Sequence, residues 1–464
     1  MKDESAVHGD FTQGPMWRNI TRIAMPMMVA QLVNIVYNLA DRIFIDHMPD
    51  GGSLAITALG LSLPVLSLVM AFANLCGVGG APLFAIARGE KNDEEARYIL
   101  GNTFMLILVF GAVLTVVGLV FCRQILMLFG ASADTIGFAH QYLFINLLGT
   151  PLVMIGLGLN PFINAQDFPK FGMISVAAGA VFNLVLDPIF IFVLGWGIVG
   201  AAVSNIIGQA ATCAWVLWFL RSKRADCRLE LKYMKLTGKR VFDICSLGIT
   251  GFIMSATNSI VGVANNSMLQ IWGGDIYIGI MTVISSVREV VTLPLLGLVN
   301  GAQPVLSYNL GAKEYGRLRK GIVFAIGAPM VYNVIVWGVL MLVPGIFVQL
   351  FNAQGDLLAN GIPAMRIYFC CWIFMGLQMS TQPIFVALRR TKTSVFFSLL
   401  RKVILVVPLV VLLPGMGFGV HGVFWAEAIS ALIGGVASFV VMYATVIRPL
   451  KLKEEGSLYE IHGD

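Results

Sequence analysis

Long apolar segments are the feature that most constrains what this chain can fold into. Cutting the sequence at charge clusters and at Pro/Gly turns leaves twelve segments, most of about 20 residues or longer and without strand-like alternation. Such segments cross a bilayer as helices, because a helix satisfies its own backbone hydrogen bonds in lipid. We therefore predict an all-α membrane protein with spans at 18–45, 54–82, 98–121, 138–160, 172–194, 198–220, 242–271, 276–308, 321–349, 360–386, 395–413 and 420–446.

The distribution of Lys and Arg among the loops predicts the orientation of these spans. Loops after the even-numbered spans are basic, with eight basic residues between Arg221 and Arg240, whereas the opposite loops have only Arg123. The opposite loops also carry Asp46, Asp50, Asp134, Asp275 and Asp356. Basic loops stay in the cytoplasm, so both termini are predicted to be cytoplasmic and the protein to lie in the cytoplasmic (inner) membrane. The net charge of +6 is thereby explained without a nucleic-acid partner.

The second half of the sequence repeats features of the first half at a constant offset of 222. This offset relates Gly79 to Gly301 and Lys91 to Lys313, and further pairs follow along much of each half. Two six-helix bundles in tandem enter the membrane in the same sense, and transporters with parallel repeats open to alternate sides by rocking of the two halves. We expect a cytoplasmic N-terminal tail at 1–17, an N-lobe at 18–220, a basic cytoplasmic linker at 221–241, a C-lobe at 242–446 and a cytoplasmic C-terminal tail at 447–464.

Acidic and amide side chains inside the spans are the candidates for chemistry, because ionisable groups are costly in lipid. Asn183 precedes Asp187 by four residues, so both side chains project from one helical face. Together with Asp41 of the first span they would form an oxygen-rich pocket for a proton or a small monovalent cation. A structural ion pair is the alternative role for Asp41, but Arg42 points about 100° away from it. For Asn183 the alternative is a hydrogen bond that bridges two helices.

A second set of charged residues lies in the second half. Arg288, Glu289 and Glu427 are candidates for a second coupling site or a gate, and a packing network is the alternative for Arg288 and Glu289. Glu427 corresponds to Asn205 at the offset of 222, so the two halves place polar groups at one equivalent depth. An offset of 220 places Val407 opposite Asp187. We therefore expect the cation chemistry in the first half and a second half that is mostly apolar or polar without charge.

The only sequence signal for a substrate-binding surface is a set of flexible or polar side chains inside the spans. Methionines and scattered polar groups line promiscuous sites, although helix packing is the alternative role for most of them. The candidates are Gln31, Tyr37, Met154, Asn160, Met254, Met281 and Gln378. The sequence has no HExxH, GxSxG or Walker motif, so we expect no enzyme and no cofactor. The coupling ion would be H⁺ or Na⁺, with no other metal and with Na⁺ held by Asp41, Asn183 and Asp187.

Several stretches together resemble the multidrug and toxic compound extrusion (MATE) transporters. They are Pro26 followed by QLVNIVYNLADRIFIDHM, then NLVLDPIFIF, GWGIVGAAVSN, and Gly-Ala-x-Pro with a following LGAK at 301–313. The resemblance implies export of diverse, often cationic, organic compounds in exchange for H⁺ or Na⁺ by rocking of two lobes. It also implies a cation site that here comprises Asp41, Asn183, Asp187 and either Ser204 or Asn205. One branch has acids in the seventh and tenth helices, but TNSIVGVANNS and LQMSTQP carry no carboxylate here.

We therefore expect a monomeric antiporter whose partners are small drug-like molecules and the lipid bilayer. A flippase for a lipid-linked saccharide is the alternative within the same broad fold. It would need a more basic cavity, for which Arg288 and Arg366 are the main candidates besides Arg42. A membrane-embedded transferase would need clustered acidic motifs such as DDxxD, which the sequence lacks.

Overall fold

A computed structural model gives the fold and describes residues 10–48, 52–129, 131, 135–349 and 356–461. These residues form helices and connecting turns, with no strand among them. Within this part of the chain, ten helices are long and apolar enough to cross a membrane, and two bent pairs raise the number to twelve. The predicted all-α architecture with twelve spans is therefore confirmed. Asp50 and Asp134, on which the predicted orientation partly rests, lie outside the described residues.

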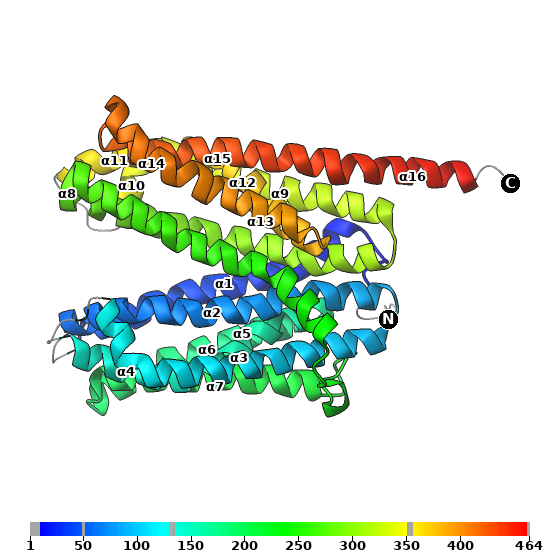
Figure 1. Cartoon of the computed structure of the whole chain (residues 1–464), viewed down its shortest axis with the longest axis horizontal. Coiled ribbons are helices and arrows are strands. Elements are labelled where there is room, and N and C mark those ends of the chain that lie inside the picture. Colours follow the sequence, from blue (N-terminus) through cyan, green and yellow to red (C-terminus); the bar gives the residue numbers. More distant parts are fainter. Residues whose placement is uncertain (1–9, 49–51, 130, 132–134, 350–355, 462–464) are drawn as a thin grey trace, which may run out of the picture. The chain divides into compact units, whose positions relative to one another are not determined.

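Contacts divide the chain into two compact units (Figure 1), of which the first comprises Met25–Phe252. It contains most of α1 (Met16–Asp46), and α2 packs on α3 and α5 while α7 packs on α4, α5 and α6. The elements after α1 are α2 (Gly52–Gly89), α3 (Asp93–Leu128), α4 (Ile136–Leu148), α5 (Thr150–Ala165), α6 (Pro169–Pro188), η1 (Ile189–Val193), α7 (Gly197–Arg221) and η2 (Leu231–Tyr233).

The second unit comprises Phe11–Ala24 and Ile253–Asp464. Its helix α12 packs on α9 and α15, and α15 also packs on α11 and α14. The elements are α8 (Gly238–Gly311), α9 (Tyr315–Leu342), α10 (Pro344–Gln349), α11 (Asp356–Phe369), α12 (Trp372–Ala387), α13 (Thr391–Leu399), η3 (Leu400–Val406), α14 (Val407–Leu413), η4 (Pro414–Phe418), α15 (His421–Met442), η5 (Tyr443–Ile447) and α16 (Arg448–Ile461). Helix α8 joins the predicted seventh and eighth spans across Gly274, whose φ is 66°.

The units differ from the expected lobes at the start of each repeat. The beginning of α1 belongs to the second unit, and the beginning of α8 belongs to the first. Glycines make both contacts close. A Cβ on Gly79 would overlap the backbone oxygen of Ile244, and a Cβ on Gly301 would lie 2.5 Å from the Cα of Ala24. Because the repeat relates Gly79 to Gly301, the same helix contact occurs once in each unit.

Backbone geometry repeats in the same way. Among the described residues other than glycine, positive φ occurs at Lys91 (57°), Asp167 (69°), Lys313 (59°) and Arg389 (58°). The offset of 222 relates Lys91 to Lys313 and Asp167 to Arg389. The bend of 54° between α4 and α5 likewise corresponds to the bend of 49° between α11 and α12. The two halves therefore share turns as well as helices, as the sequence repeat predicts.

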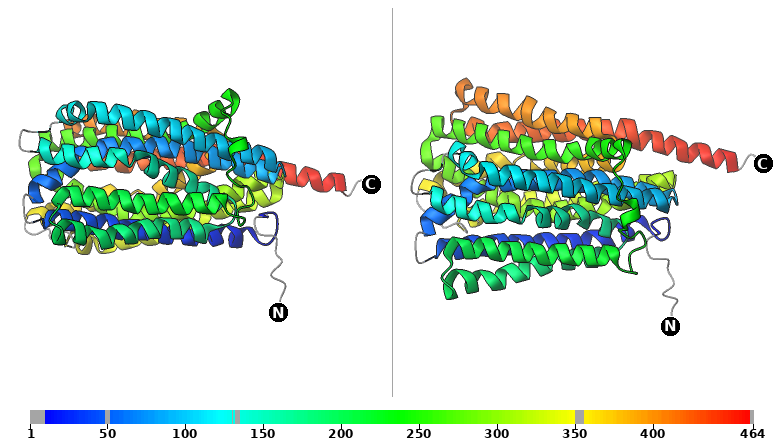
Figure 2. Two further views of the ribbon diagram at one scale, coloured as in Figure 1. Left: turned by 90° about the horizontal axis from the view of Figure 1, so that it is seen from below. Right: turned by 60° about the horizontal axis from the view of Figure 1, so that its bottom comes forward.

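Segments expected to be tails or linkers pack against the bundles. In the linker, Tyr233 is buried and meets the ring of Tyr98 edge-on at 4.9 Å. At the corresponding position of the first half, Phe11 is also buried, and its ring meets Tyr308 at 5.4 Å. The expected C-terminal tail continues the last span as a helix to Ile461. Figure 2 shows α15 and α16 as one long rod.

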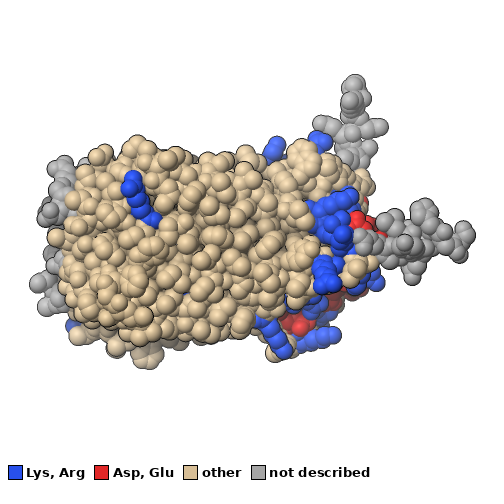
Figure 3. Space-filling model, turned by 90° about the horizontal axis from the view of Figure 1, so that it is seen from above, with Lys and Arg blue, Asp and Glu red and all other residues tan. Residues whose placement is uncertain are grey.

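The outer surface of the helices is largely apolar, as contact with lipid requires. Exposed apolar side chains follow α3, where Val116 and Val120 are each more than half exposed. On the face drawn in Figure 3, Lys and Arg side chains gather at the end from which α16 extends, and the remainder of that face is nearly free of charge. A helix that is apolar on its exposed side is buried by lipid rather than by protein.

Candidate functional site

A fully buried carboxylate between α6 and α7 is the centre of the candidate site. Asp187 has no solvent exposure, and the hydroxyl of Ser204 on α7 donates a hydrogen bond to its Oδ1. Asn183 lies one turn earlier on the same face of α6, as predicted. With its amide oriented to satisfy both neighbours, Asn183 donates to Asp187 Oδ2 at 2.6 Å and accepts from the backbone N–H of Asn205 at 3.3 Å. Both carboxylate oxygens therefore have a donor from the protein.

Two glycines let α6 and α7 approach closely enough for these hydrogen bonds. A Cβ on Gly208 would lie 2.7 Å from the backbone oxygen of Gly179, and a Cβ on Gly179 would lie 2.9 Å from the backbone oxygen of Gly208. Gly179 is one turn before Asn183 and Gly208 is one turn after Ser204. The backbones thus touch just beside the polar side chains, as small residues allow in membrane helices.

The helix changes form directly after the carboxylate. Pro188 has no N–H to donate, and the next five residues, Ile189–Val193, form the π-helical turn η1 in which the N–H of Leu194 bonds to the carbonyl of Ile189 at 2.9 Å. Such π-helical turns are frequent at functional sites. The α6 backbone is therefore weakly constrained at the residue that carries the charge.

Helix α1 supplies the predicted Asp41 and, in addition, Tyr37. The Asp41 carboxyl lies within hydrogen-bonding reach of the Asp187 carboxyl, and both interact electrostatically with Tyr37. The Tyr37 hydroxyl donates to Asn205 Oδ1 at 3.4 Å. The structure thus brings together the residues that the sequence proposed, namely Asp41, Asn183, Asp187, Ser204 and Asn205.

Asn146 belongs to this network and was missed in the sequence. It lies on α4 and is buried, and its Oδ1 accepts a hydrogen bond from Asn205 Nδ2 at 2.9 Å. Its own Nδ2 donates to the backbone oxygen of Tyr142 at 2.9 Å. An asparagine inside the apolar span 138–160 was the available signal.

An apolar cluster adjoins the polar network. Its buried members include Ile45 of α1, Leu143 and Leu147 of α4, Ile191 of η1 and Ile198 of α7. Helices α1, α4 and α7 also carry polar side chains of the network, and η1 directly follows Asp187. The network is therefore bordered by packed hydrocarbon, which strengthens electrostatic interactions within it.

The donor set suits a hard monovalent cation or a proton. Carboxylate, amide and hydroxyl oxygens are the ligands that hard cations prefer, and two neighbouring carboxyl groups favour a positive charge or a shared proton between them. Among the described residues, no group of three or more His, Cys, Asp or Glu side chains forms a cluster that would hold a metal ion.

The predicted secondary residues lie apart from this network, in the second unit. Glu427 is buried and accepts a hydrogen bond from Arg401 at 3.0 Å. Arg288 donates to the Tyr368 hydroxyl at 3.0 Å, whereas Glu289 and Arg366 are exposed. Sequence reasoning missed Arg401 and Lys402, both of which are buried, although two adjacent basic residues inside the apolar run 395–413 were a clear signal.

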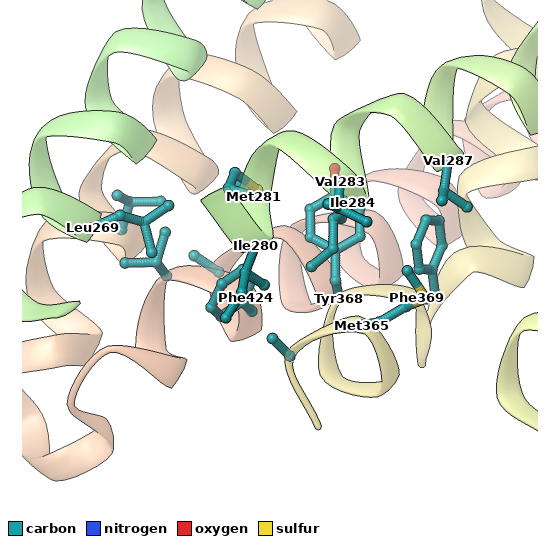
Figure 4. Packing of buried hydrophobic residues seen from close by; sticks show 14 of the residues in the cluster. Leu269, Ile280, Met281, Val283, Ile284, Val287, Met365, Tyr368, Phe369 and Phe424 are labelled. Atoms are coloured by element: carbon teal, nitrogen blue, oxygen red, sulfur yellow. The ribbon is translucent and has the colours of Figure 1, made fainter. Parts of the chain in front are cut away.

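The proposed substrate residues have diverse surroundings. Met154 is fully buried, and Met281 lies in a core cluster with Ile284, Tyr368 and Phe424 (Figure 4). Asn160 donates to the Ser175 hydroxyl at 2.7 Å and Gln378 to the backbone oxygen of Phe397 at 3.1 Å. Gln31, Tyr37 and Met254 are partly buried. Their role in binding stays a prediction.

Comparisons with known proteins agree with both the repeat and the fold. The MatE family model matches residues 26–189 and again residues 252–412, once in each half. Multidrug export protein MepA of Staphylococcus haemolyticus (strain JCSC1435) is 24% identical over 461 residues, covering 99% of this chain and 100% of the relative. MepA of Staphylococcus aureus (strain MSSA476) is 24% identical over 446 residues, covering 96% of each chain.

Solved structures show the same fold. A MATE protein in complex with MaD3S superposes with a TM-score of 0.90 at 22% identity, covering 97% of this chain and 100% of that one. A multidrug resistance MATE family transporter in an outward-facing conformation gives 0.89 at 22% identity with the same coverage. Because the family model covers most of both halves, the chain belongs to the MatE family of transporters and is not an enzyme.

Proposed function

We propose that this protein exports small organic compounds in exchange for an inward-moving H⁺ or Na⁺ that binds at Asp41, Asn183 and Asp187. The observation that carries this proposal is the pair of neighbouring carboxyl groups formed by Asp41 and the fully buried Asp187. Relatives over the whole length of the chain are named multidrug export proteins, which supports drug-like substrates.

A charge buried in a membrane protein is costly. Two carboxylates that lie next to each other inside a membrane protein repel each other and lack water, so binding of a proton or cation lowers their free energy. An ion drives transport only if it binds more tightly to one of two conformations. The proline and π-helical turn beside Asp187 give α6 a means of moving its carboxylate between two arrangements. We propose that the two halves alternate by a rocker-switch motion, which is recurrent in parallel-repeat transporters.

We also propose an orientation in the membrane and an assembly state. The basic loops support placing both termini in the cytoplasm of a cell whose inner membrane holds the protein. One chain is sufficient for the ion site, because Asp41 and Asp187 both belong to the first unit. We therefore propose a monomer as the functional form.

Dye efflux from proteoliposomes tests the mechanism. An imposed pH gradient and an imposed Na⁺ gradient are applied separately, and the gradient that drives uphill efflux of a cationic dye identifies the ion. We expect Asp41→Asn and Asp187→Asn each to abolish gradient-driven efflux while the protein stays folded in the membrane. Glu90→Gln, at an exposed carboxylate outside the site, is the matched control and should keep full efflux. Uphill efflux that persists in both Asn variants contradicts the proposal.

Flipping of a lipid-linked saccharide is a second candidate, favoured by one observation. Such a substrate carries pyrophosphate, and the second unit buries Arg401 and Lys402. Deletion of the gene separates the two functions: sensitivity to cationic dyes supports export, and loss of an envelope polymer supports flipping.

A further inference from the structure

The second unit buries more positive charge than negative charge. Arg401 and Lys402 of η3 and Glu427 of α15 are each more than nine-tenths buried. Arg401 donates to Glu427 at 3.0 Å, which forms one ion pair, and Lys402 Nζ donates to the backbone oxygen of Met254 at 2.9 Å. Among the buried side chains described in this unit, Glu427 is the one carboxylate, so these three groups together carry one excess positive charge when Lys402 is protonated.

A further cation lies at the edge of this group. Arg288 of α8 is partly buried, donates to the Tyr368 hydroxyl at 3.0 Å and interacts electrostatically with Glu427. Lys402 interacts electrostatically with Arg401, Glu427 and Arg288. Side chains and backbone from α8, α11, η3 and α15 therefore converge on one basic cluster, which we define as Arg288, Arg401, Lys402 and Glu427.

The basic cluster occupies the place that corresponds to the cation site in the other half. At the repeat offset of 222, Glu427 corresponds to Asn205 and Tyr368 corresponds to Asn146. In the first unit, those two asparagines are bonded to each other in the network around Asp187. In the second unit, the corresponding residues interact with Arg401 and Arg288. Equivalent places in the two halves thus hold two carboxyl groups in one, and three basic groups with a single carboxylate in the other.

The cluster retains donors for a ligand. The Nε of Arg401 is buried and has no hydrogen-bond partner in the described structure. The Lys402 ammonium has three N–H groups, and one bond, to Met254, accounts for only one of them. Buried cations without a counter-charge are expensive in a medium of low dielectric constant, and an Arg edge matches the planar shape of a carboxylate. One monovalent anion would balance the excess charge of the fully buried groups.

We propose that the basic cluster binds the carboxylate group of an organic anion or zwitterion. This inference rests on the proposed function, because it names a class of substrate for the same transporter. The first half would then bind the coupling cation, and the second half would select compounds that carry a carboxylate. Arg401 Nε and Lys402 Nζ donate to the carboxylate, and Glu427 holds the Arg401 guanidinium in place.

Equilibrium binding of a matched pair of dyes tests the inference. Rhodamine 110 has a free carboxylate, and rhodamine 123 is its methyl ester, so their affinities for the purified full-length protein can be compared by fluorescence anisotropy. Two variants remove donors from the cluster. Lys402→Gln removes one charge, and the double variant Arg401→Gln with Glu427→Gln removes the ion pair without changing the net charge of the cluster. Arg366→Gln, at an exposed arginine of α11, is the control.

We expect wild-type protein to bind rhodamine 110 about 10-fold more tightly than rhodamine 123, which corresponds to about 1.4 kcal/mol. Lys402→Gln and the double variant should each weaken rhodamine 110 about 10-fold and change rhodamine 123 by less than about 2-fold. Equal affinity of wild-type protein for the two dyes overturns the inference, as does equal weakening of both dyes in the variants. Displacement of rhodamine 110 by inorganic pyrophosphate at lower concentrations than by benzoate also overturns it, in favour of a lipid pyrophosphate.

Separate results would contradict the antiport proposal and the carboxylate-site proposal. Gradient-driven efflux of rhodamine 123 with no preference for rhodamine 110 in binding would leave antiport intact and remove the carboxylate site. Preferential binding of rhodamine 110 that depends on Lys402, without gradient-driven efflux of either dye, would support the site and remove the antiport proposal.

Discussion

The hydroxyl of Ser204 donates a hydrogen bond to the carboxylate of Asp187, and both side chains are fully buried between α6 and α7. This pair joins two consecutive spans at the place where the α6 backbone changes into a π-helical turn. The same hydroxyl also lies 2.9 Å from the backbone oxygen of Ala201, so its proton has two alternative acceptors. A hydroxyl with a second acceptor can keep a hydrogen bond when an ion takes its place at the carboxylate.

Removal of this hydroxyl should weaken transport without unfolding the protein. A hydrogen bond to a charged group is worth about 1.5–3 kcal/mol, so Ser204→Ala is expected to reduce gradient-driven efflux about 10-fold or more. Ser204→Thr keeps the hydroxyl and should retain most of the activity. Rates in proteoliposomes at matched protein content give the measurement, and an Ala variant as active as wild type would show that the hydroxyl has no part in coupling.

Close packing of α6 on α7 should depend on a glycine. In Gly179→Ala the new Cβ would overlap Thr212 Oγ1 and press on the Gly208 carbonyl, so we expect a loss of stability of about 1–3 kcal/mol. Gly338→Ala on α9 is the matched control, because nothing lies within 4 Å of its Cβ position. Thermal unfolding followed by size-exclusion fluorescence measures both variants. Equal melting temperatures for the two variants would contradict the packing argument.

The paired turns should tolerate glycine better than lysine. Lys91 and Lys313 are exposed and have φ values of 57° and 59°, a conformation that costs an L-residue about 1 kcal/mol. We expect Lys91→Gly and Lys313→Gly each to raise the free energy of unfolding by up to about that amount. Lys320→Gly lies inside helix α9 and should lower stability by about 1 kcal/mol. Melting temperatures that fall in all three variants would rule out relief of strain at the turns.

The thiol in the linker should react slowly with maleimides. Burial raises the pKa of Cys227 from 9.0 to about 11, with Arg88 acting in the opposite direction. At pH 8 the thiolate is then about 0.1% of the thiol, against about 10% at the ordinary pKa. In a variant that keeps Cys227 as its only cysteine, the labelling rate should rise about 10-fold per pH unit up to about pH 11. A plateau near pH 9 would show that the folded protein leaves this thiol unshifted.

The raised pKa of the Cys227 thiol also makes the stability of the protein depend on pH above 9.0. The thiol pKa is raised in the folded state, so its contribution to stability is complete below the unfolded pKa of 9.0. That contribution is lost as the pH rises from 9.0 toward 11. Cys227→Ala should therefore flatten the fall in melting temperature over this interval.

The sequence by itself determined the helices, their number and the repeat. Apolar length marks a span because lipid cannot hydrogen-bond to a backbone, and the internal repeat survives as shared bends and shared positive φ values. The sequence also proposed Asp41, Asn183, Asp187, Ser204 and Asn205 as neighbours, from i,i+4 spacing, from the cost of buried charge and from resemblance to the family.

Tertiary structure decided which other side chains converge and which elements share a unit. Asn146 joins the first network only through a bond to Asn205 across 59 residues of chain, and Arg401 meets Glu427 across 26. One residue of rotation turns a helical side chain by about 100°, so hydropathy shows that a charge is in a span but not which neighbour it faces. The second half was expected to be mostly apolar or polar without charge because Val407 stands opposite Asp187 at the offset of 220. Helix packing instead gathers Arg288, Arg401 and Lys402 into one cluster.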